Sequence, residues 1–571
     1  MTILDRFRSS GVASLLFALL LIVAPGLAGA ATITIVNNDG AGEGFNDGTP
    51  VSPVGGNPGT TRGQQRLNVF QEAANIWGAI LTSTVTIQVR AQFNNQFCDA
   101  SSAVLGSAGP LTYHSDFANA EFTSTWYHQA LANRLAETDL SSGLPDINAT
   151  FNSQLDTGVC LGGLTWYYGF DGLEGANIEL LPVVLHEIGH GLGFSTPTNK
   201  ANGAYLSGQP GVYDRFLFDN TVSLHWHEMT ATQRAASAIN TGNLVWDGAA
   251  AVAAAAIYLD GRPRMLVNSP AGIAGSYPAV SATFGAAVTV GGLTGNLVLA
   301  DDGVAPENDI CSAVVNGGAV SGNIALIDRG NCTFVAKVQF AQAAGATGVI
   351  IANNVPGLPT TNLGGTDPSI TIPVIGISQE DGTTLKANLG TGVNVTISLH
   401  PTQKIGTDNS GRPLMYAPAV LEGGSSVSHW DVSLAPNALM EPFINNDLHN
   451  TVDLARDLME DIGWFNGIVS VTPGQTVAAG TMFVGGATPN PTRQGTSVTF
   501  RIGQPEFVRL AIVDVNGRRV RTLHEGMLLS GEHTRSWDGR TDRSGDAAPG
   551  VYFITLGTST GVTTRRVALM N

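Results

Sequence analysis

Residues 186–190 read His-Glu-Ile-Gly-His, a spacing that can hold a metal ion. His186 and His190 are four positions apart, so on a helix their rings lie on one face. Glu187 is adjacent to the first histidine and can act as general base on a metal-bound water. A zinc ion held there would lower the pKa of that water and polarise a substrate carbonyl. The pattern therefore predicts Zn²⁺ as cofactor, with His186 and His190 as ligands and Glu187 as the base.

A catalytic zinc ion needs a third protein ligand, and the sequence offers two places for it. The longer form of this motif has a histidine six residues after the second one, where this chain has Thr196. Local candidates are His225, His227 and Glu228. The distant candidate is His429, and a domain inserted between ligands would explain its separation.

The elements that must position these residues follow an α/β order. A helix over 179–193 carries the motif; Pro182 suits its first turn, and Gly193 suits its end. Hydrophobic periodicity predicts the elements before it: helices over 63–82 and 124–137, and strands over 85–93, 147–153 and 164–170.

The pattern of hydrophobic and turn residues changes downstream of the motif helix. An alanine-rich helix is expected near 248–256, a helix over 334–345 among short Val/Ile strands, and a helix over 450–464. The last 80 or so residues alternate between turn signals and predict a small β-sandwich. We expect a signal peptide (1–30), the N-terminal part of a catalytic domain (31–267), an inserted domain (268–403), the C-terminal part of the catalytic domain (404–468), a linker (469–490) and the sandwich (491–571).

The N-terminal residues predict export. Arg6 and Arg8 precede an apolar stretch, and residues 28–30 have the small-x-small form of a cleavage site, so residues 1–30 are interpreted as a signal peptide. A membrane anchor is the alternative reading, but the apolar core is short and ends at Pro25. No other segment is apolar enough to span a bilayer, so we expect a secreted protein without stable membrane insertion after cleavage.

Bulk composition excludes some partners. Hydrophobic residues make up 43% of the 571 residues and charged residues 13%, which favours folded domains, more than one of them. Lys and Arg number 28 against 45 Asp and Glu, a net charge of −17. This excess of negative charge argues against nucleic acid and against anionic membrane surfaces as partners.

Four cysteines fit an oxidising compartment. Cys98 and Cys160 lie upstream of the histidine motif, whereas Cys311 and Cys332 lie close together downstream. Pairing within each group is the expected arrangement, and free buried thiols are the alternative.

Four motifs in order resemble the leishmanolysin family of metzincins. They are HEIGHGLGF, a distant SHW, ALMEP eleven residues beyond that histidine, and LMEDIGW. The resemblance implies a metzincin-like catalytic domain of mixed α/β (α+β) fold, with His429 as the third zinc ligand after His186 and His190. It implies that Met440 lies in a tight turn beneath the metal, and that Gly193 turns the chain away from the helix. This chain differs from the eukaryotic members in lacking their dense set of cysteines.

The inserted and C-terminal segments carry resemblances of their own. Residues 306–380 are similar to the protease-associated (PA) domain, a β-rich module, which supports a Cys311–Cys332 bridge and implies contact with substrate or partner proteins. The C-terminal segment looks like the immunoglobulin-like module of flagellar hook-capping proteins and is comparable to sorting tails. A sorting signal and an adhesion module are both open.

These observations predict a secreted zinc endopeptidase acting on protein or peptide substrates. Two alternatives remain: a non-catalytic exported adhesion or scaffold protein that retains the fold, and a zinc hydrolase of small substrates. The intact Glu187 argues against the first alternative, because a degenerate protease has no need of that base.

Overall fold

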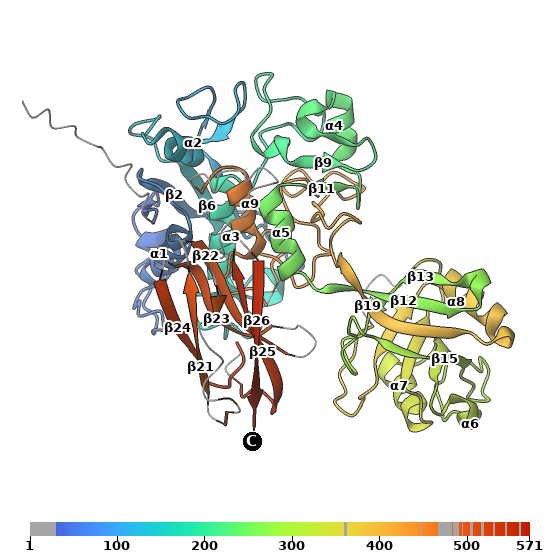
Figure 1. The fold of residues 1–571 in the computed structure, drawn as a ribbon. Helices are drawn as coiled ribbons and strands as arrows, with labels where there is room; N and C mark the ends of the chain where they lie inside the picture. The colour runs from blue at the N-terminus through green and yellow to red at the C-terminus, as the bar shows by residue number, and fades with distance from the viewer. Residues whose placement is uncertain are drawn as a thin grey trace, which may run out of the picture.

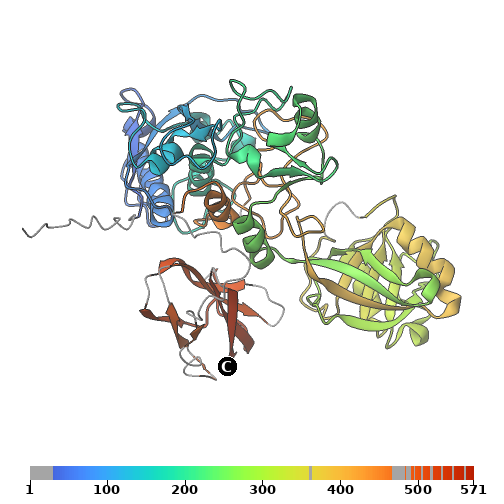
Figure 2. The same cartoon turned by 45° about the horizontal axis from the view of Figure 1, so that its top comes forward.

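The computed structural model describes residues 30–358, 363–445, 447–465, 482–483, 490, 492–493, 495–502, 506–514, 519–528, 531–542, 545–558 and 561–570. The predicted signal peptide lies outside these residues except for Ala30, as does most of the predicted linker. Along the described ranges, no helix is both long and apolar enough to cross a membrane. The chain forms three bodies, which both ribbon views separate (Figures 1 and 2).

The first body is built on a four-stranded sheet of order β1-β2-β6-β3. β1, β2 and β6 are parallel, while β3 runs antiparallel to β6 and forms an edge. Phe70, Phe93 and Phe151 fill the space between this sheet and α1, with ring centroids 4.8 to 5.9 Å apart. The bounds are β1 Ile33–Asn37, α1 Arg62–Ile80, β2 Ile87–Asn94, β3 Gly106–Pro110, β4 Tyr113–His114, β5 Tyr127–His128, α2 Gln129–Ala136, β6 Ile147–Asn152, β7 Trp166–Tyr167, β8 Ile178–Glu179 and α3 Leu180–Leu192.

Two elements that precede the motif helix are shorter than the sequence suggested. The helix expected over 124–137 begins only at Gln129, because residues 127–128 pair with β4 as strand β5. The strand expected over 164–170 is reduced to β7. Beyond it the chain turns so that Tyr168 accepts from Asn57 at its carbonyl and donates to Asp156 through its hydroxyl. In both places long-range pairing overrides local periodicity.

The motif helix α3 is buried on nearly every side and lies against the sheet. Its contact with β6 is close, because a Cβ added at Gly191 would lie 2.4 Å from Cγ2 of Ile147. Gly193 ends the helix at φ 140°, a conformation that side chains rarely adopt. The indole of Trp464 donates to the carbonyl of Leu192, 2.8 Å away, and closes that end.

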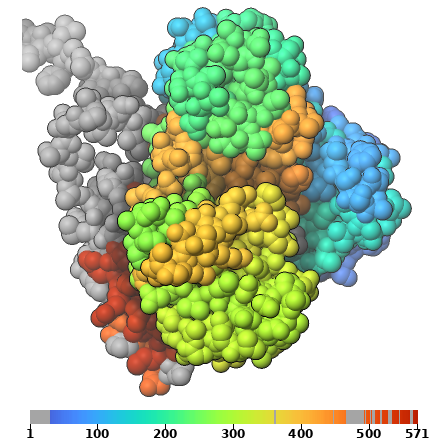
Figure 3. All heavy atoms as spheres, turned by 90° about the vertical axis from the view of Figure 1, so that its right-hand side faces the viewer, coloured from blue at the N-terminus to red at the C-terminus, as the bar shows by residue number. Residues whose placement is uncertain are grey.

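The rest of the first body comes from both sides of the insertion. Residues 404–465 (orange in Figure 3) lie against the green segment near residues 200–250. Asp461 on α9 accepts from the amides of Ala250 and Ala251 and from the indole of Trp246, which ties α9 to α5. The bounds are β9 Leu217–Asp219, β10 Leu224–His225, α4 Ala231–Ser237, β11 Leu244–Trp246, α5 Ala249–Tyr258 and α9 Asp453–Asp461.

The second body is an eight-stranded sheet of order β13-β12-β19-β15-β16-β17-β18-β14. Its first and last long strands, β12 and β19, pair with each other and lead to the first body (Figure 1). The predicted boundary at 268 falls inside β12, because the strand extends back to Gly261. The bounds are β12 Gly261–Ser269, β13 Gly275–Pro278, β14 Val280–Ser281, β15 Leu293–Leu299, α6 Gly317–Val320, β16 Ile324–Asp328, α7 Phe334–Ala343, β17 Gly348–Ala352, β18 Val374–Ile377, α8 Gln379–Asn388 and β19 Asn394–Lys404.

The third body consists of two antiparallel sheets around one core. β20-β21-β24 and β23-β22-β25-β26 bury residues such as Phe500, Ile512 and Ile554 between them. Arg509 reaches Asp457 of α9 at 3.2 Å, so this body contacts the first one. The bounds are β20 Met482–Phe483, β21 Thr496–Ile502, β22 Glu506–Asp514, β23 Arg519–Leu528, β24 Gly531–Trp537, β25 Gly550–Thr558 and β26 Gly561–Leu569.

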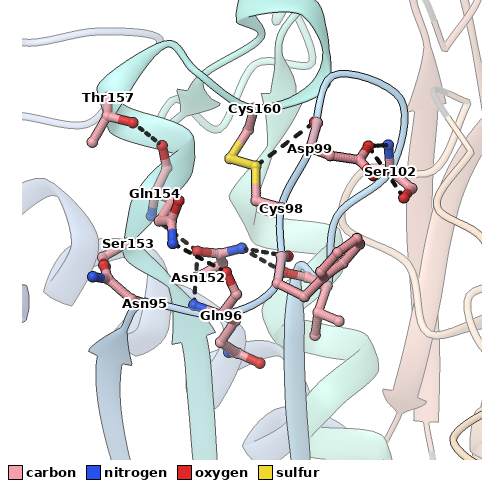
Figure 4. The surroundings of a disulfide bond; sticks show 12 residues. Asn95, Gln96, Cys98, Asp99, Ser102, Asn152, Ser153, Gln154, Thr157 and Cys160 are labelled. Carbon is pink, nitrogen blue, oxygen red and sulfur yellow. Dashed lines mark hydrogen bonds between the residues drawn. A yellow bond between two sulfur atoms is a disulfide. The ribbon is translucent and has the colours of Figure 1, made fainter.

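Both expected disulfides are present. Cys98 pairs with Cys160, and Cys311 pairs with Cys332. The first bridge ties the loop after β2 to the segment after β6 (Figure 4), where the Asn152 side-chain amide also donates to the Val104 carbonyl at 2.8 Å. This bridge therefore holds the loop that leads into the edge strand β3.

Candidate metal centre

Three imidazole rings converge in the first body. Nε2 of His186 lies 3.1 Å from Nε2 of His190 and 3.1 Å from Nε2 of His429, and the last two atoms are 3.2 Å apart. The first two histidines come from α3, whereas His429 comes from the segment after the inserted body. The structure thus brings together the three predicted ligands across more than 230 residues of chain.

The second nitrogen of each ring fixes where its proton sits. Each Nδ1 is within hydrogen-bonding distance of a backbone carbonyl oxygen. The partners are Leu439 for His186 at 2.6 Å, Phe194 for His190 at 2.8 Å and Ser425 for His429 at 2.7 Å. A carbonyl only accepts, so each Nδ1 carries the proton, and each neutral ring presents a bare Nε2 to the other two. Burial keeps the rings neutral at pH 7, because it lowers the pKa of His186 to about 4, of His190 to about 3 and of His429 well below its ordinary value.

Three lone pairs that face one another repel, since no proton is left to lie between them. A cation at their centre turns this repulsion into attraction. Three nitrogens around a tetrahedral zinc ion at 2.0–2.1 Å would be roughly 3.3 Å apart, close to the observed 3.1–3.2 Å. Hydrogen bonds from the far ring nitrogen to carbonyls are also what zinc-binding histidines make. The residues fit a zinc ion.

Backbone contacts place His429. The carbonyl of His429 accepts from the amide of Tyr416 at 2.9 Å, and the amide of Trp430 donates to the carbonyl of Met440 at 2.8 Å. Trp430 is fully buried and meets Phe194 edge-on, with centroids 5.0 Å apart. The residues beside His429 are therefore core residues, which hold its ring at the end of α3.

Glu187 lies between the histidine cluster and the edge strand. A Cβ added at Gly106 of β3 would lie 3.1 Å from Cγ of Glu187, and the backbone amide of Ala108 in the same strand lies near enough to the carboxylate to lower its pKa. Burial raises the pKa of Glu187 to about 8, and the Ala108 amide opposes that rise. A carboxyl group with a pKa near neutrality can both accept and return a proton.

Met440 lies beneath α3. Its side chain is fully buried, and a Cβ added at Gly189 would lie 2.9 Å from its Sδ. The turn that carries it is fixed by a buried carboxylate, because the Leu439 amide donates to Asp453 at 2.7 Å. Leu439 is the residue whose carbonyl binds His186, so this turn positions the histidine ring directly.

Thr196 has a structural role in place of the histidine of the longer motif. Its hydroxyl donates to Asp214 at 2.5 Å, the hydroxyl of Thr198 donates to the other oxygen at 2.6 Å, and the amide of Gly211 donates at 2.8 Å. Asp214 is fully buried. This network anchors the chain as it leaves the motif helix.

The local ligand candidates lie elsewhere. His225 contacts Asp247 at 2.7 Å and Glu228 at 3.2 Å, and neither it nor His227 belongs to the cluster formed by His186. His225 ends strand β10, which pairs with β9, and His227 lies in the short helical turn Trp226–Glu228 that follows it. Of the alternatives that the sequence left open, only His429 meets the pair on α3.

Sequence reasoning missed the edge strand. Residues 106–110 read Gly-Ser-Ala-Gly-Pro and carry no alternation of large apolar side chains, so no strand was expected there. Only the parallel strands beside it had a readable pattern.

Comparisons with known proteins identify one part of the chain. Residues 293–385 match the family described as PA domain, so the second body contains a PA domain. The chain is 39% identical over 97 residues to "Probable leucine aminopeptidase 2" of Arthroderma benhamiae, covering 17% of this chain and 19% of that protein. It is 34% identical over 126 residues to "Signal peptide peptidase-like 5" of Oryza sativa subsp. japonica, covering 21% and 22%.

Among solved structures, BSAP, a zinc aminopeptidase from Bacillus subtilis, matches at 30% identity with a TM-score of 0.18, covering 26% of this chain and 36% of that chain. The chain spans about a fifth of the length of the curated relatives it matches.

Proposed function

We propose that this chain is a secreted, zinc-dependent endopeptidase of the leishmanolysin-like metzincin type. The observation that carries the proposal is the cluster of three neutral imidazoles with converging Nε2 atoms beside the carboxylate of Glu187. His186, His190 and His429 would hold the zinc ion. Once bound, zinc would supply a Lewis acid that polarises a carbonyl and makes a water nucleophilic at neutral pH.

Glu187 is the proton carrier of the proposed reaction. Its buried carboxylate takes a proton from the attacking water and then delivers it to the nitrogen of the departing amine.

The edge strand β3 supports an extended peptide as the substrate. β6 is its only partner among the described strands, and Glu187 lies beside β3, because a Cβ added at Gly106 would be 3.1 Å from its Cγ. An open edge offers backbone groups that can pair with an extended peptide. A peptide paired along β3 would run past Glu187 in both directions, which favours cleavage within a chain over removal of a terminal residue.

Export and the outer modules complete the proposal. Two disulfides fit an oxidising compartment. The PA domain is connected to the first body through β12 and β19 and would contact protein substrates or partners. The alternative of a non-catalytic adhesion or scaffold protein predicts the same metal site without hydrolysis.

Casein cleavage by four variants tests the proposal. Glu187→Gln should bind zinc as the wild type does and lose about 10²–10⁴-fold in kcat, whereas Glu228→Gln, its exposed control, should cleave normally. His429→Ala should lose zinc and activity together, and His227→Ala should keep both.

Products separate the candidate functions. Internal fragments support an endopeptidase, and release of amino-terminal residues alone, as by an aminopeptidase, would contradict it. Full casein cleavage by Glu187→Gln would refute the assignment of the base.

A further inference from the structure

A second group of metal-binding side chains lies at the start of the motif helix. One donor atom each of Glu174, Glu179 and His449 lies within 4.8 Å of the others. Glu179 is the last residue before α3, Glu174 lies in the loop that precedes β8, and His449 lies in the loop that precedes α9. The stretch that leads into α3 and the distant loop before α9 therefore meet at this point.

A glycine allows the loop that carries Glu174 to approach His449 closely. Gly172 has φ 65°, and a Cβ added there would lie 2.7 Å from Cε1 of His449. The loop that carries Glu174 thus lies directly against the imidazole. Asp171 in the same loop is already engaged, because it accepts from the hydroxyl of Tyr167 at 2.5 Å and from the amide of Leu173 at 3.2 Å.

The carboxylates of the group are not satisfied by the protein. The side chain of Glu179 is only 4% exposed. Its Oε2 accepts from Nδ1 of His449 at 2.8 Å, but its Oε1 is buried without a hydrogen-bond partner. Oε2 of Glu174 is also buried without one. A buried carboxylate oxygen left without a hydrogen-bond partner is destabilising, so two such oxygens beside one imidazole favour a bound cation at this point.

We propose that Glu174, Glu179 and His449 form a second site for a divalent transition-metal ion of the zinc class. Two carboxylates and one imidazole are a donor set that zinc accepts, and the imidazole disfavours calcium and magnesium, which prefer oxygen ligands. The ion would satisfy both orphaned oxygens and neutralise the two glutamates together.

The position indicates what this ion would do. Glu179 precedes His186 by seven residues, a rise of about 10 Å along a helix. Ions that share one reaction are roughly 3.5–4 Å apart, so this ion would not join the chemistry at the histidine cluster. It would tie the start of α3 to the loop between Met440 and α9, and so stabilise the segments that hold the histidines.

Zinc stoichiometry of the full chain tests the inference independently of the proposed function. After removal of metal by chelation and reloading with Zn²⁺ alone, the wild type should retain two equivalents. Glu174→Gln and His449→Ala should each retain one and should unfold at a lower temperature in zinc than the wild type. Glu174→Gln leaves the Glu179–His449 contact intact, so it reports on the site even if His449→Ala does not fold.

Controls separate a metal site from an ordinary ion pair. His225 also contacts two carboxylates, and His225→Ala should retain two equivalents. His429→Ala should retain the one equivalent of the second site. If the wild type binds one equivalent and Glu174→Gln also binds one, the second site is refuted while the histidine cluster stands. Loss of the equivalent in Glu174→Gln with no change in His429→Ala would refute the histidine cluster instead. In a parallel reloading with equal concentrations of Zn²⁺ and Ca²⁺, retention of calcium in preference to zinc at the second site would overturn the zinc-class assignment.

Discussion

Replacing Gly191 by alanine should destabilise the first body, although alanine is the better helix former. The added Cβ would lie 2.4 Å from Cγ2 and 2.8 Å from Cδ1 and Cγ1 of Ile147. Ile147 is fully buried and belongs to β6, so it cannot turn away. Because three atoms of Ile147 would lie within 2.8 Å of the new Cβ, the overpacking cost should be near the upper end of the usual range, about 3 kcal/mol. The gain in helix propensity of about 1 kcal/mol leaves a net loss of about 2 kcal/mol.

Gly189 provides the matched control. A Cβ there would meet Sδ of Met440 at 2.9 Å, which is near the end of a flexible side chain that can adapt. We expect Gly189→Ala to change the free energy of unfolding by less than about 1 kcal/mol.

Differential scanning calorimetry resolves the two variants. The transition of the first body should fall by about 3–8 °C in Gly191→Ala and by less than about 2 °C in Gly189→Ala. Ile147→Ala should relieve the clash, so the Gly191→Ala/Ile147→Ala double variant should lose less stability than the sum of the singles. A Gly191→Ala protein as stable as the wild type would refute the close contact between α3 and the sheet.

Three further predictions concern charge, cross-links and metal. Burial raises the pKa of Asp461 to about 6 in the folded protein. Because this pKa lies above that of the unfolded chain, protonated Asp461 favours the folded state by about 3 kcal/mol. This contribution is fully present below pH 4 and is lost as pH rises through 6. In denaturant titrations Asp461→Asn should lose that pH dependence, and an unchanged profile would contradict it. Replacing Cys98 and Cys160 by serine should lower the free energy of unfolding by about 2–5 kcal/mol, measured by calorimetry against the wild type, and equal stability would argue against the bridge. Chelation of zinc should abolish casein cleavage and added Zn²⁺ should restore it, whereas activity that survives complete metal removal would exclude the proposed chemistry.

The sequence predicted the motif helix because its signals are local. Spacing of four between His186 and His190, Pro182 in the first turn and Gly193 at the end are all read within one element, and the structure has α3 over Leu180–Leu192. The third histidine is a different case. Its position beside α3 depends on the core contacts of Trp430 and on Met440, and in the sequence only the resemblance of four ordered motifs to the leishmanolysin family pointed to it.

The edge strand and the second cluster were beyond sequence reasoning for physical reasons. β3 is built of small residues, and it is a strand because β6 offers it a partner. Glu174, Glu179 and His449 are separated by up to 275 residues, and no metal-binding motif in the sequence includes any of them. Their proximity depends on how the loops before β8 and α9 fold together.

Anomalous scattering at the zinc edge from zinc-soaked crystals would show whether a zinc ion binds between the three histidines. We expect a peak 2.0–2.1 Å from Nε2 of each of His186, His190 and His429. A peak on His225 or His227, or no peak at the three converging rings, would contradict it.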